Sequence, residues 1–181
     1  MRTLNIKSVL PYAGLPAIVA ALLLAHTGRA DAYLLLRFEL LAVFGYLAAV
    51  SDVKTRQISN GLVMMMLATW AIIMTPKLFL DTDSALNMLG DSVLGLAAAG
   101  GLFLIVYLIS RKGLGGGDVK FMAVSGLYLG FNGSLSAIFC GTVLAALTGL
   151  ALILNKKITR KDTIPLAPFL YAGMLITLFL P

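Results

Sequence analysis

Residues 87–109 read NMLGDSVLGLAAAGGLFLIVYLI, and Asp91 is the only charged residue among them. A helix needs about 20 mostly apolar residues in a row to cross the hydrocarbon core of a bilayer. This stretch meets that requirement without interruption. It therefore predicts a transmembrane helix, and with it a membrane protein.

The rest of the chain repeats this pattern. Of the 181 residues, 60% are hydrophobic and 12% are charged, whereas a typical soluble domain has about 25% charged residues. We therefore expect an all-α integral membrane protein, folded as one domain over 1–181 into a polytopic bundle of six to seven transmembrane helices. Besides 87–109, the apolar segments are 9–25, 32–50, 61–75, 121–129, 135–154 and 165–180.

Two of these segments are short for simple spans. Segment 61–75 is followed by Pro76, which we expect to end its helix. Segment 121–129 has too few residues to cross the membrane as a straight helix, so a tilted or partial helix is expected there. Gly126 and Gly130 stand four residues apart, a spacing that predicts close helix packing.

Lysine and arginine are concentrated in one set of connecting segments. The positive-inside rule assigns that side to the cytoplasm and places the N-terminus there. The same rule explains the net charge of +6, so a nucleic-acid partner is not expected. Eleven of the fourteen basic residues lie on this side: Arg2, Lys7, Lys54, Arg56, Arg111, Lys112, Lys120, Lys156, Lys157, Arg160 and Lys161.

Cys140 and His26 are the only cysteine and the only histidine of the chain. One thiol cannot form an internal disulfide or a structural zinc site, and with a single histidine we expect no Ser-His-Asp, Cys-His or histidine-rich metal site unless His26 alone serves. We expect neither a metal nor another cofactor. Cys140 is interpreted as a small apolar residue of a span, and His26 as an interfacial residue.

Ionisable residues within or beside spans are costly and are therefore candidates for function. Asp52 ends segment 32–50 and Asp118 follows 87–109, so the predicted topology places both at the cytoplasmic face. Glu39 lies inside a span, about 20 Å along the helix from Asp52. Two interpretations of Glu39 stay open, a structural polar contact or a functional role. Asp91 is expected to reach water or a lipid headgroup.

Glycine dominates the approach to Asp118. Residues 113–117 read GLGGG, which lets the backbone come close to a bound chain. A phosphate-binding loop would end in Gly-Lys-Ser/Thr instead. If the carboxyl groups of Asp52 and Asp118 lie close together, ionising both is unfavourable because the two negative charges repel, so one carboxyl group keeps its proton. The ionised partner can then activate water while the protonated one polarises a peptide carbonyl. Two independent interfacial acids remain the alternative.

Three motifs resemble those of the type IV prepilin peptidases, a family of membrane aspartyl proteases. Gly115-Gly116-Gly117-Asp118-Val119-Lys120 is similar to the Gly-x-Gly-Asp-x-Lys signature. Asp52, Arg56, Ile58 and Asn60 resemble Asp-x-x-x-x-x-Ile-Pro-Asn, with Ser59 in place of proline. Residues 164–170, IPLAPFL, resemble Ile-Pro-Phe-x-Pro-Phe-Leu and include Pro165 and Pro168. Together the motifs cover a core of about 51–173.

This resemblance implies a function. Family members cut the basic leader from type IV pilin-like precursors at the cytoplasmic face of the bacterial inner membrane. It implies Asp52 and Asp118 as the catalytic pair, and pilus assembly machinery as an indirect partner. Bifunctional members also methylate the new N-terminus by means of a cysteine tetrad. With one cysteine, this sequence is expected to act as a peptidase only, most similar to members that serve Flp-type (tight-adherence) pili.

Further roles are hypotheses. Lys120 and Arg56 flank the aspartates and either hold acidic groups of the substrate, tune the pair or anchor lipid headgroups. Pro165 and Pro168 are expected to support the site by packing. The rival functions are a polytopic transporter, in which Glu39, Arg37 and Asp91 line a polar path, and an inert pilus-assembly factor.

Overall fold

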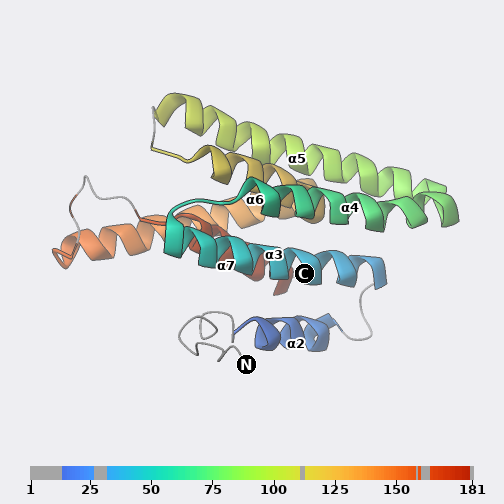
Figure 1. Ribbon diagram of the computed structural model, residues 1–181, viewed down its shortest axis with the longest axis horizontal. Helices are drawn as coiled ribbons and strands as arrows, with labels where there is room; N and C mark the ends of the chain where they lie inside the picture. The colour runs from blue at the N-terminus through green and yellow to red at the C-terminus, as the bar shows by residue number, and fades with distance from the viewer. Residues whose placement is uncertain (1–13, 27–31, 111–112, 158, 160–163, 180–181) are drawn as a thin grey trace, which may run out of the picture.

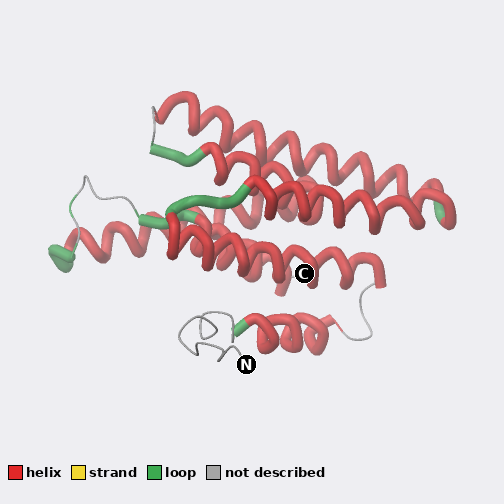
Figure 2. The backbone as a smooth tube through the Cα atoms, in the orientation of Figure 1, coloured by secondary structure: helices red, strands yellow, loops and turns green. Residues whose placement is uncertain are grey.

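The computed structural model describes residues 14–26, 32–110, 113–157, 159 and 164–179. Those residues form helices joined by short loops and contain no strand, which confirms the all-α prediction (Figures 1 and 2). The helices are α2 (Leu15–His26), α3 (Ala32–Thr55), α4 (Asn60–Leu80), α5 (Thr82–Ser110), α6 (Gly116–Leu154) and α7 (Ala167–Phe179).

Four of these helices, α3 to α6, are long and apolar enough to cross a membrane. The shorter apolar helices are α2 and α7. Segment 9–25 lies partly outside the described residues, which begin at Gly14. Large apolar side chains cover much of the surface, including Ile72, Phe79, Ile109 and Phe139. A membrane protein with lipid-facing helices has such a surface. The number of crossings and the side of the N-terminus stay predictions.

The expectation that Pro76 ends a helix is wrong. Helix α4 continues through Pro76 to Leu80. Proline removes one backbone donor, which membrane helices tolerate when nearby polar side chains bond the local carbonyls. The carbonyl left without its helix donor is that of Ile72, and the nearby Thr75 Oγ1 donates to the neighbouring Ala71 O at 2.8 Å. The segment is therefore a full 21-residue helix, long enough for a span.

Helix α6 is broken at Gly130, where φ is 71° and ψ is −175°. Only glycine adopts this backbone conformation readily. The break divides α6 into 116–129 and 131–154, so the apolar segments 121–129 and 135–154 seen in the sequence are indeed separate. The first half begins at Gly116, five residues before the predicted start. The close packing of α5 and α6 uses both glycines of the predicted spacing, because the backbones of Gly126 and Gly130 both lie against Gly95, and Gly130 also carries the break.

The chain reverses direction at this break. Along 116–129, Ala123 faces Gly100 and Gly126 faces Gly95, so this half runs antiparallel to α5. The second half runs antiparallel to α7, with Gly141 against Leu170 and Gly133 near Thr177. In Figure 1 the second half of α6 accordingly returns toward the end of the molecule at which the first half began. The first half is also the most buried element, with Phe121, Met122 and Tyr128 fully enclosed.

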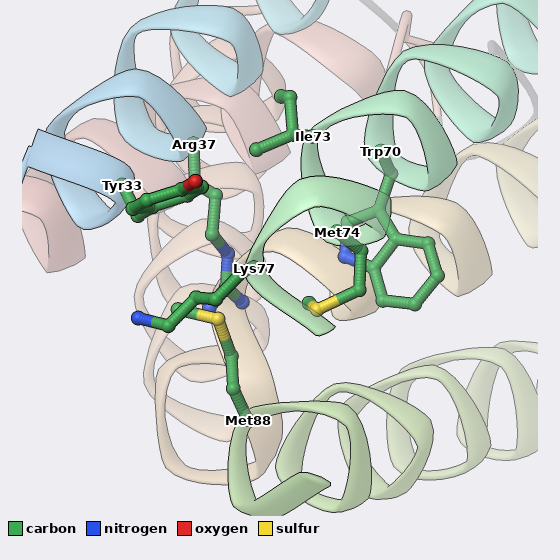
Figure 3. A pocket seen from close by; sticks show the side chains of 7 residues that line it. All are labelled: Tyr33, Arg37, Trp70, Ile73, Met74, Lys77 and Met88. Atoms are coloured by element: carbon green, nitrogen blue, oxygen red, sulfur yellow. The ribbon is translucent and has the colours of Figure 1, made fainter. Parts of the chain in front are cut away.

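A break in a membrane helix leaves carbonyl groups without intrahelical donors, and Arg37 supplies donors here. Its Nη2 lies 2.9 Å from Leu127 O, 2.8 Å from Tyr128 O and 3.3 Å from Ser92 Oγ. Trp70 Nε1 donates to the same Leu127 carbonyl at 3.0 Å. The Arg37 side chain is 5% exposed and lies beside Tyr33 and Lys77 (Figure 3). A cation here also complements the negative end of the helix dipole.

The other side of the break is held by Asp91. Its Oδ1 accepts a hydrogen bond of 3.0 Å from Phe131 N, the first amide after Gly130. The carboxylate lies so close to Gly130 that a side chain at that position would collide with it. Asp91 is exposed, as expected, but the sequence analysis missed this bond. An acidic residue at the start of the second half favours its helix dipole.

We expect Gly130→Ala to destabilise the protein. A non-glycine residue with positive φ costs about 1–2 kcal/mol, and the new methyl group would collide with Asp91. The midpoint of thermal unfolding in detergent should fall by about 2–8 °C. Gly101→Ala is the matched control, because nothing lies within 4 Å of its added methyl group and alanine favours a helix. Equal midpoints for the two variants would contradict this account of the break.

We also expect Arg37→Met to lower the midpoint of thermal unfolding. The Leu127 carbonyl keeps Trp70 as its donor, whereas the Tyr128 carbonyl loses the Arg37 bond. A buried acceptor left without a donor costs about 1–3 kcal/mol. Arg56→Met, on an exposed loop residue, makes the same chemical change as a control. An Arg37→Met protein as stable as the Arg56→Met protein would show that the guanidinium does not stabilise the break.

Candidate active site

Asp52 lies in the last turn of α3 and is 7% exposed. Its Oδ2 accepts a hydrogen bond of 3.0 Å from the backbone N–H of Ala167, the first residue of α7. First-turn N–H groups have no partner within their own helix. The carboxylate supplies one, and the positive end of the α7 dipole favours negative charge there.

Two prolines surround the donor of this bond. Pro165 precedes α7 and Pro168 lies in its first turn, where a missing N–H breaks no intrahelical bond. Leu166 O accepts from Phe169 N at 3.0 Å and from Leu170 N at 3.1 Å, so the turn is fully formed. Pro165 and Pro168 thus lie on both sides of the Ala167 amide, and their support of the site by packing stays a prediction.

Asp118 lies in the first turn of α6, three residues after the N-cap Gly115. Its Oδ2 accepts from Gly115 N at 3.2 Å. Its Oδ1 is buried and has no hydrogen-bond partner among the residues that the structure describes. This second oxygen is therefore available to a bound molecule.

The structure brings the two aspartates together. Their carboxyl groups are close enough to interact electrostatically, although 66 positions separate them in the sequence. Asp52 comes from the end of α3, and Asp118 from the start of α6. The reversal at Gly130 keeps α7 at this end of the bundle as well. Of the two alternatives left open by the sequence, the geometry favours a pair over two independent acids.

The glycines before Asp118 differ in what surrounds them. A methyl group at Gly115 would lie 2.9 Å from Asp118 Oδ2. One at Gly117 would lie 3.2 Å from Ile58 O and 3.3 Å from Ile58 Cβ, which is tighter than ordinary contact. A methyl group at Gly116 would meet nothing within 4 Å. Neighbouring atoms thus leave too little room for a side chain at position 115 or 117, whereas a side chain at position 116 would meet none.

The α3–α4 loop forms the other wall of the site. Ile58 is buried against Gly117, and Ser59 is the N-cap of α4, its Oγ accepting from Leu62 N at 3.3 Å. Lys120 Nζ donates to Asn60 Oδ1 at 3.0 Å, which joins α4 to α6. Arg56 is exposed and has a positive φ of 55° after the end of α3.

Glu39 is partly buried on α3, thirteen positions before Asp52, and both interpretations of it stay open. No three His, Cys, Asp or Glu side chains gather into a metal-binding group within the described ranges. The Ala167 amide is the site component that sequence reasoning missed. The available signal was a free N–H between two prolines at the start of an apolar segment.

Comparison with known proteins agrees with the motifs. The model of the type IV leader peptidase family matches residues 39–150. A prepilin leader peptidase/N-methyltransferase of Bacillus subtilis (strain 168) is 32% identical over 133 residues, which are 72% of this chain and 50% of the relative. One of Burkholderia pseudomallei (strain 1026b) is 31% identical over 150 residues, 77% of this chain and 46% of that protein.

The chain thus spans about half the length of the curated relatives it matches. No solved structure matches it. The family match includes both aspartates, the glycine motif and the Gly130 break. On these grounds the chain belongs to the type IV leader peptidase family.

Proposed function

We propose that this protein is an aspartic endopeptidase that removes the leader from type IV prepilin-like precursors, with Asp52 and Asp118 as its catalytic pair. The observation that carries the proposal is the pairing of these two carboxyl groups, one buried and one half-buried, at one end of a membrane-type helical bundle. Membership of the type IV leader peptidase family and the activity for which its relatives are named support the substrate class.

The two carboxyl groups have different surroundings, which suggests different roles. Asp52 accepts a bond from the start of α7, a position that favours an ionised carboxylate. Like charges at close range disfavour double ionisation, so Asp118 holds the shared proton. Its unpartnered Oδ1 can donate that proton to a peptide carbonyl.

Cleavage then proceeds in two steps. Asp52 takes a proton from a water molecule, whose oxygen adds to the scissile carbonyl carbon, while Asp118 protonates the carbonyl oxygen. The tetrahedral intermediate collapses when the C–N bond breaks and Asp52 returns its proton to the leaving amine. Asp118 recovers its own proton from the intermediate as the carbonyl re-forms. Both carboxyl groups end as they began.

The finer parts of the proposal rest on the sequence. The excess of lysine and arginine beside both aspartates supports an active site on the cytoplasmic side of the inner membrane. The similarity to compact family members supports Flp-type precursors. The single cysteine supports cleavage without methylation.

The flanking residues support the pair in this proposal. Lys120 joins α6 to α4 through Asn60, which suggests a positioning role. Pro165 and Pro168 fix the turn that presents the Ala167 amide to Asp52. Arg56, exposed at the loop, is placed to meet an acidic group of a substrate.

We expect Asp52→Asn and Asp118→Asn to lose cleavage activity by at least about 100-fold, because each removes one proton-transfer group. Both changes keep the size of the side chain. The measurement is cleavage of an Flp-type precursor by purified protein in vesicles, followed by mass spectrometry of the product. The mass should correspond to an unmethylated N-terminus.

Asp81→Asn is the control, since Asp81 lies between α4 and α5 and bonds Ser84. Normal cleavage by either active-site variant would refute the catalytic pair. A wild-type protein that cleaves no pilin-like precursor would instead favour an inert assembly factor.

We expect Gly117→Ala to reduce cleavage at least tenfold while Gly116→Ala leaves it within about twofold. The methyl group at 117 presses on the Ile58 backbone and shifts the first turn of α6, which carries Asp118. A misplacement of about 1 Å can cost 100-fold in rate. Comparing kcat for the two variants at equal folded protein tests this. Equal rates would mean that the contact with Ile58 does not position Asp118.

A further inference from the structure

A groove runs between α3 and α7 beside Asp52. Its walls are Tyr46, Ala49, Val50, Val53 and Lys54 of α3 and Pro168 and Tyr171 of α7. Helices α3 and α7 pack against each other, and both lie away from α5 (Figure 1). The groove holds about 270 Å³ and is almost entirely apolar.

The groove is lined by residues that neighbour Asp52 and its hydrogen-bond donor Ala167 in the sequence. Ala49 and Val53 lie three residues before and one residue after Asp52 on the same helix. Pro168 directly follows Ala167, whose amide binds Asp52. From Val53 to Tyr46 the groove extends about 10 Å along α3, at 1.5 Å per residue. It therefore leads from the level of the carboxylate toward the middle of the span.

The shape of the groove depends on two aromatic side chains. Tyr46 and Tyr171 meet edge to face, with ring centroids 6.0 Å apart. Gly45 makes room for the Tyr171 ring, since a methyl group there would lie 2.6 Å from it. Tyr171 is 7% exposed, and its hydroxyl has no hydrogen-bond partner among the described residues. A buried hydroxyl without a partner is costly unless a bound molecule supplies one.

The volume of the groove and the residues that line it limit the kind of molecule that can bind there. Drug-sized ligands occupy pockets of about 300–1,000 Å³ that contain several placed polar groups. This groove is smaller and has few polar groups, so it suits one or two apolar side chains with a neighbouring polar backbone group. A polypeptide segment offers both, because its carbonyl and N–H groups can bond the Tyr171 hydroxyl.

We propose that this groove binds the apolar segment of the substrate next to its scissile bond, and so selects the substrate. The inference rests on the proposed peptidase function. A chain whose scissile bond lies at Asp52 and Asp118 has this apolar groove directly beside it. Recognition through apolar contact also fits the basic surroundings of the site, since a basic leader gains nothing from direct charge attraction there.

Filling the groove tests the proposal. We expect Val53→Trp to raise KM for a full-length precursor in vesicles at least tenfold. Cleavage of a short soluble peptide that spans the scissile bond but lacks the apolar segment should stay within twofold of wild type. Val93→Trp on α5 is the matched control, because Val53 and Val93 are 58% and 51% exposed. It should leave both reactions unchanged.

The outcomes separate the two proposals. If wild-type protein cleaves neither substrate, the peptidase function fails. If wild type cleaves both and Val53→Trp matches it on both, the groove proposal is overturned. Equal losses on both substrates would also overturn it, because they would show damage to the catalytic pair rather than to substrate selection.

A crosslinking experiment identifies the occupant directly. A photoreactive benzophenone side chain is introduced at Val53, or at Val93 as control, in the Asp118→Asn protein. In vesicles with full-length precursor, the group at 53 should crosslink to the apolar segment of the precursor, and the group at 93 should not. Crosslinks at 53 to lipid alone would overturn the proposal.

Discussion

The bond between the Arg37 guanidinium and the carbonyls of Leu127 and Tyr128 is the interaction on which the rest of the structure depends. Hydrocarbon offers no water to a carbonyl, so a helix can stop inside a bundle only where protein donors replace the lost backbone bonds. Arg37 and Trp70 provide those donors from α3 and α4. Their presence allows α6 to break at Gly130 and reverse, instead of continuing as one helix of 39 residues.

The reversal determines how the site is assembled. The first half of α6 lies buried in the bundle with Asp118 at its start, and the second half returns to pack along α7. As a result, the start of α7 reaches Asp52. Asp118 lies in the first turn of α6, and the Asp52 carboxylate, although it comes from the last turn of α3, bonds the first N–H of α7. Each carboxyl group therefore lies at the N-terminus of a helix whose dipole favours negative charge. This arrangement offsets part of the repulsion between two acids that a buried pair must otherwise bear.

Much of this arrangement could be predicted from the sequence. Long apolar runs fix the helices, and the motifs around Asp52 and Asp118 identify the candidate pair. Other features depend on tertiary contacts that leave little local trace. Pro76 has the sequence signature of a helix end, yet α4 continues through it to Leu80, as helices of membrane bundles can. Gly130 fits a packing spacing, and its positive φ is stabilised by Asp91 of another helix. The Ala167 amide carries no side-chain signal at all.

Ser59 stands where the family motif has proline, and the structure shows what this serine does instead. Proline at that position would fix the entry into α4 through its restricted φ. Serine also fixes the start of α4, because its Oγ accepts a hydrogen bond from the Leu62 N–H and so caps the helix. The neighbouring residues contact the start of α6, since Ile58 lies against Gly117 and Asn60 accepts a hydrogen bond from Lys120. What the motif specifies is therefore the position of the loop relative to the first turn of α6. A residue that differs from the motif therefore leaves the site intact when it holds the loop in that same position relative to α6.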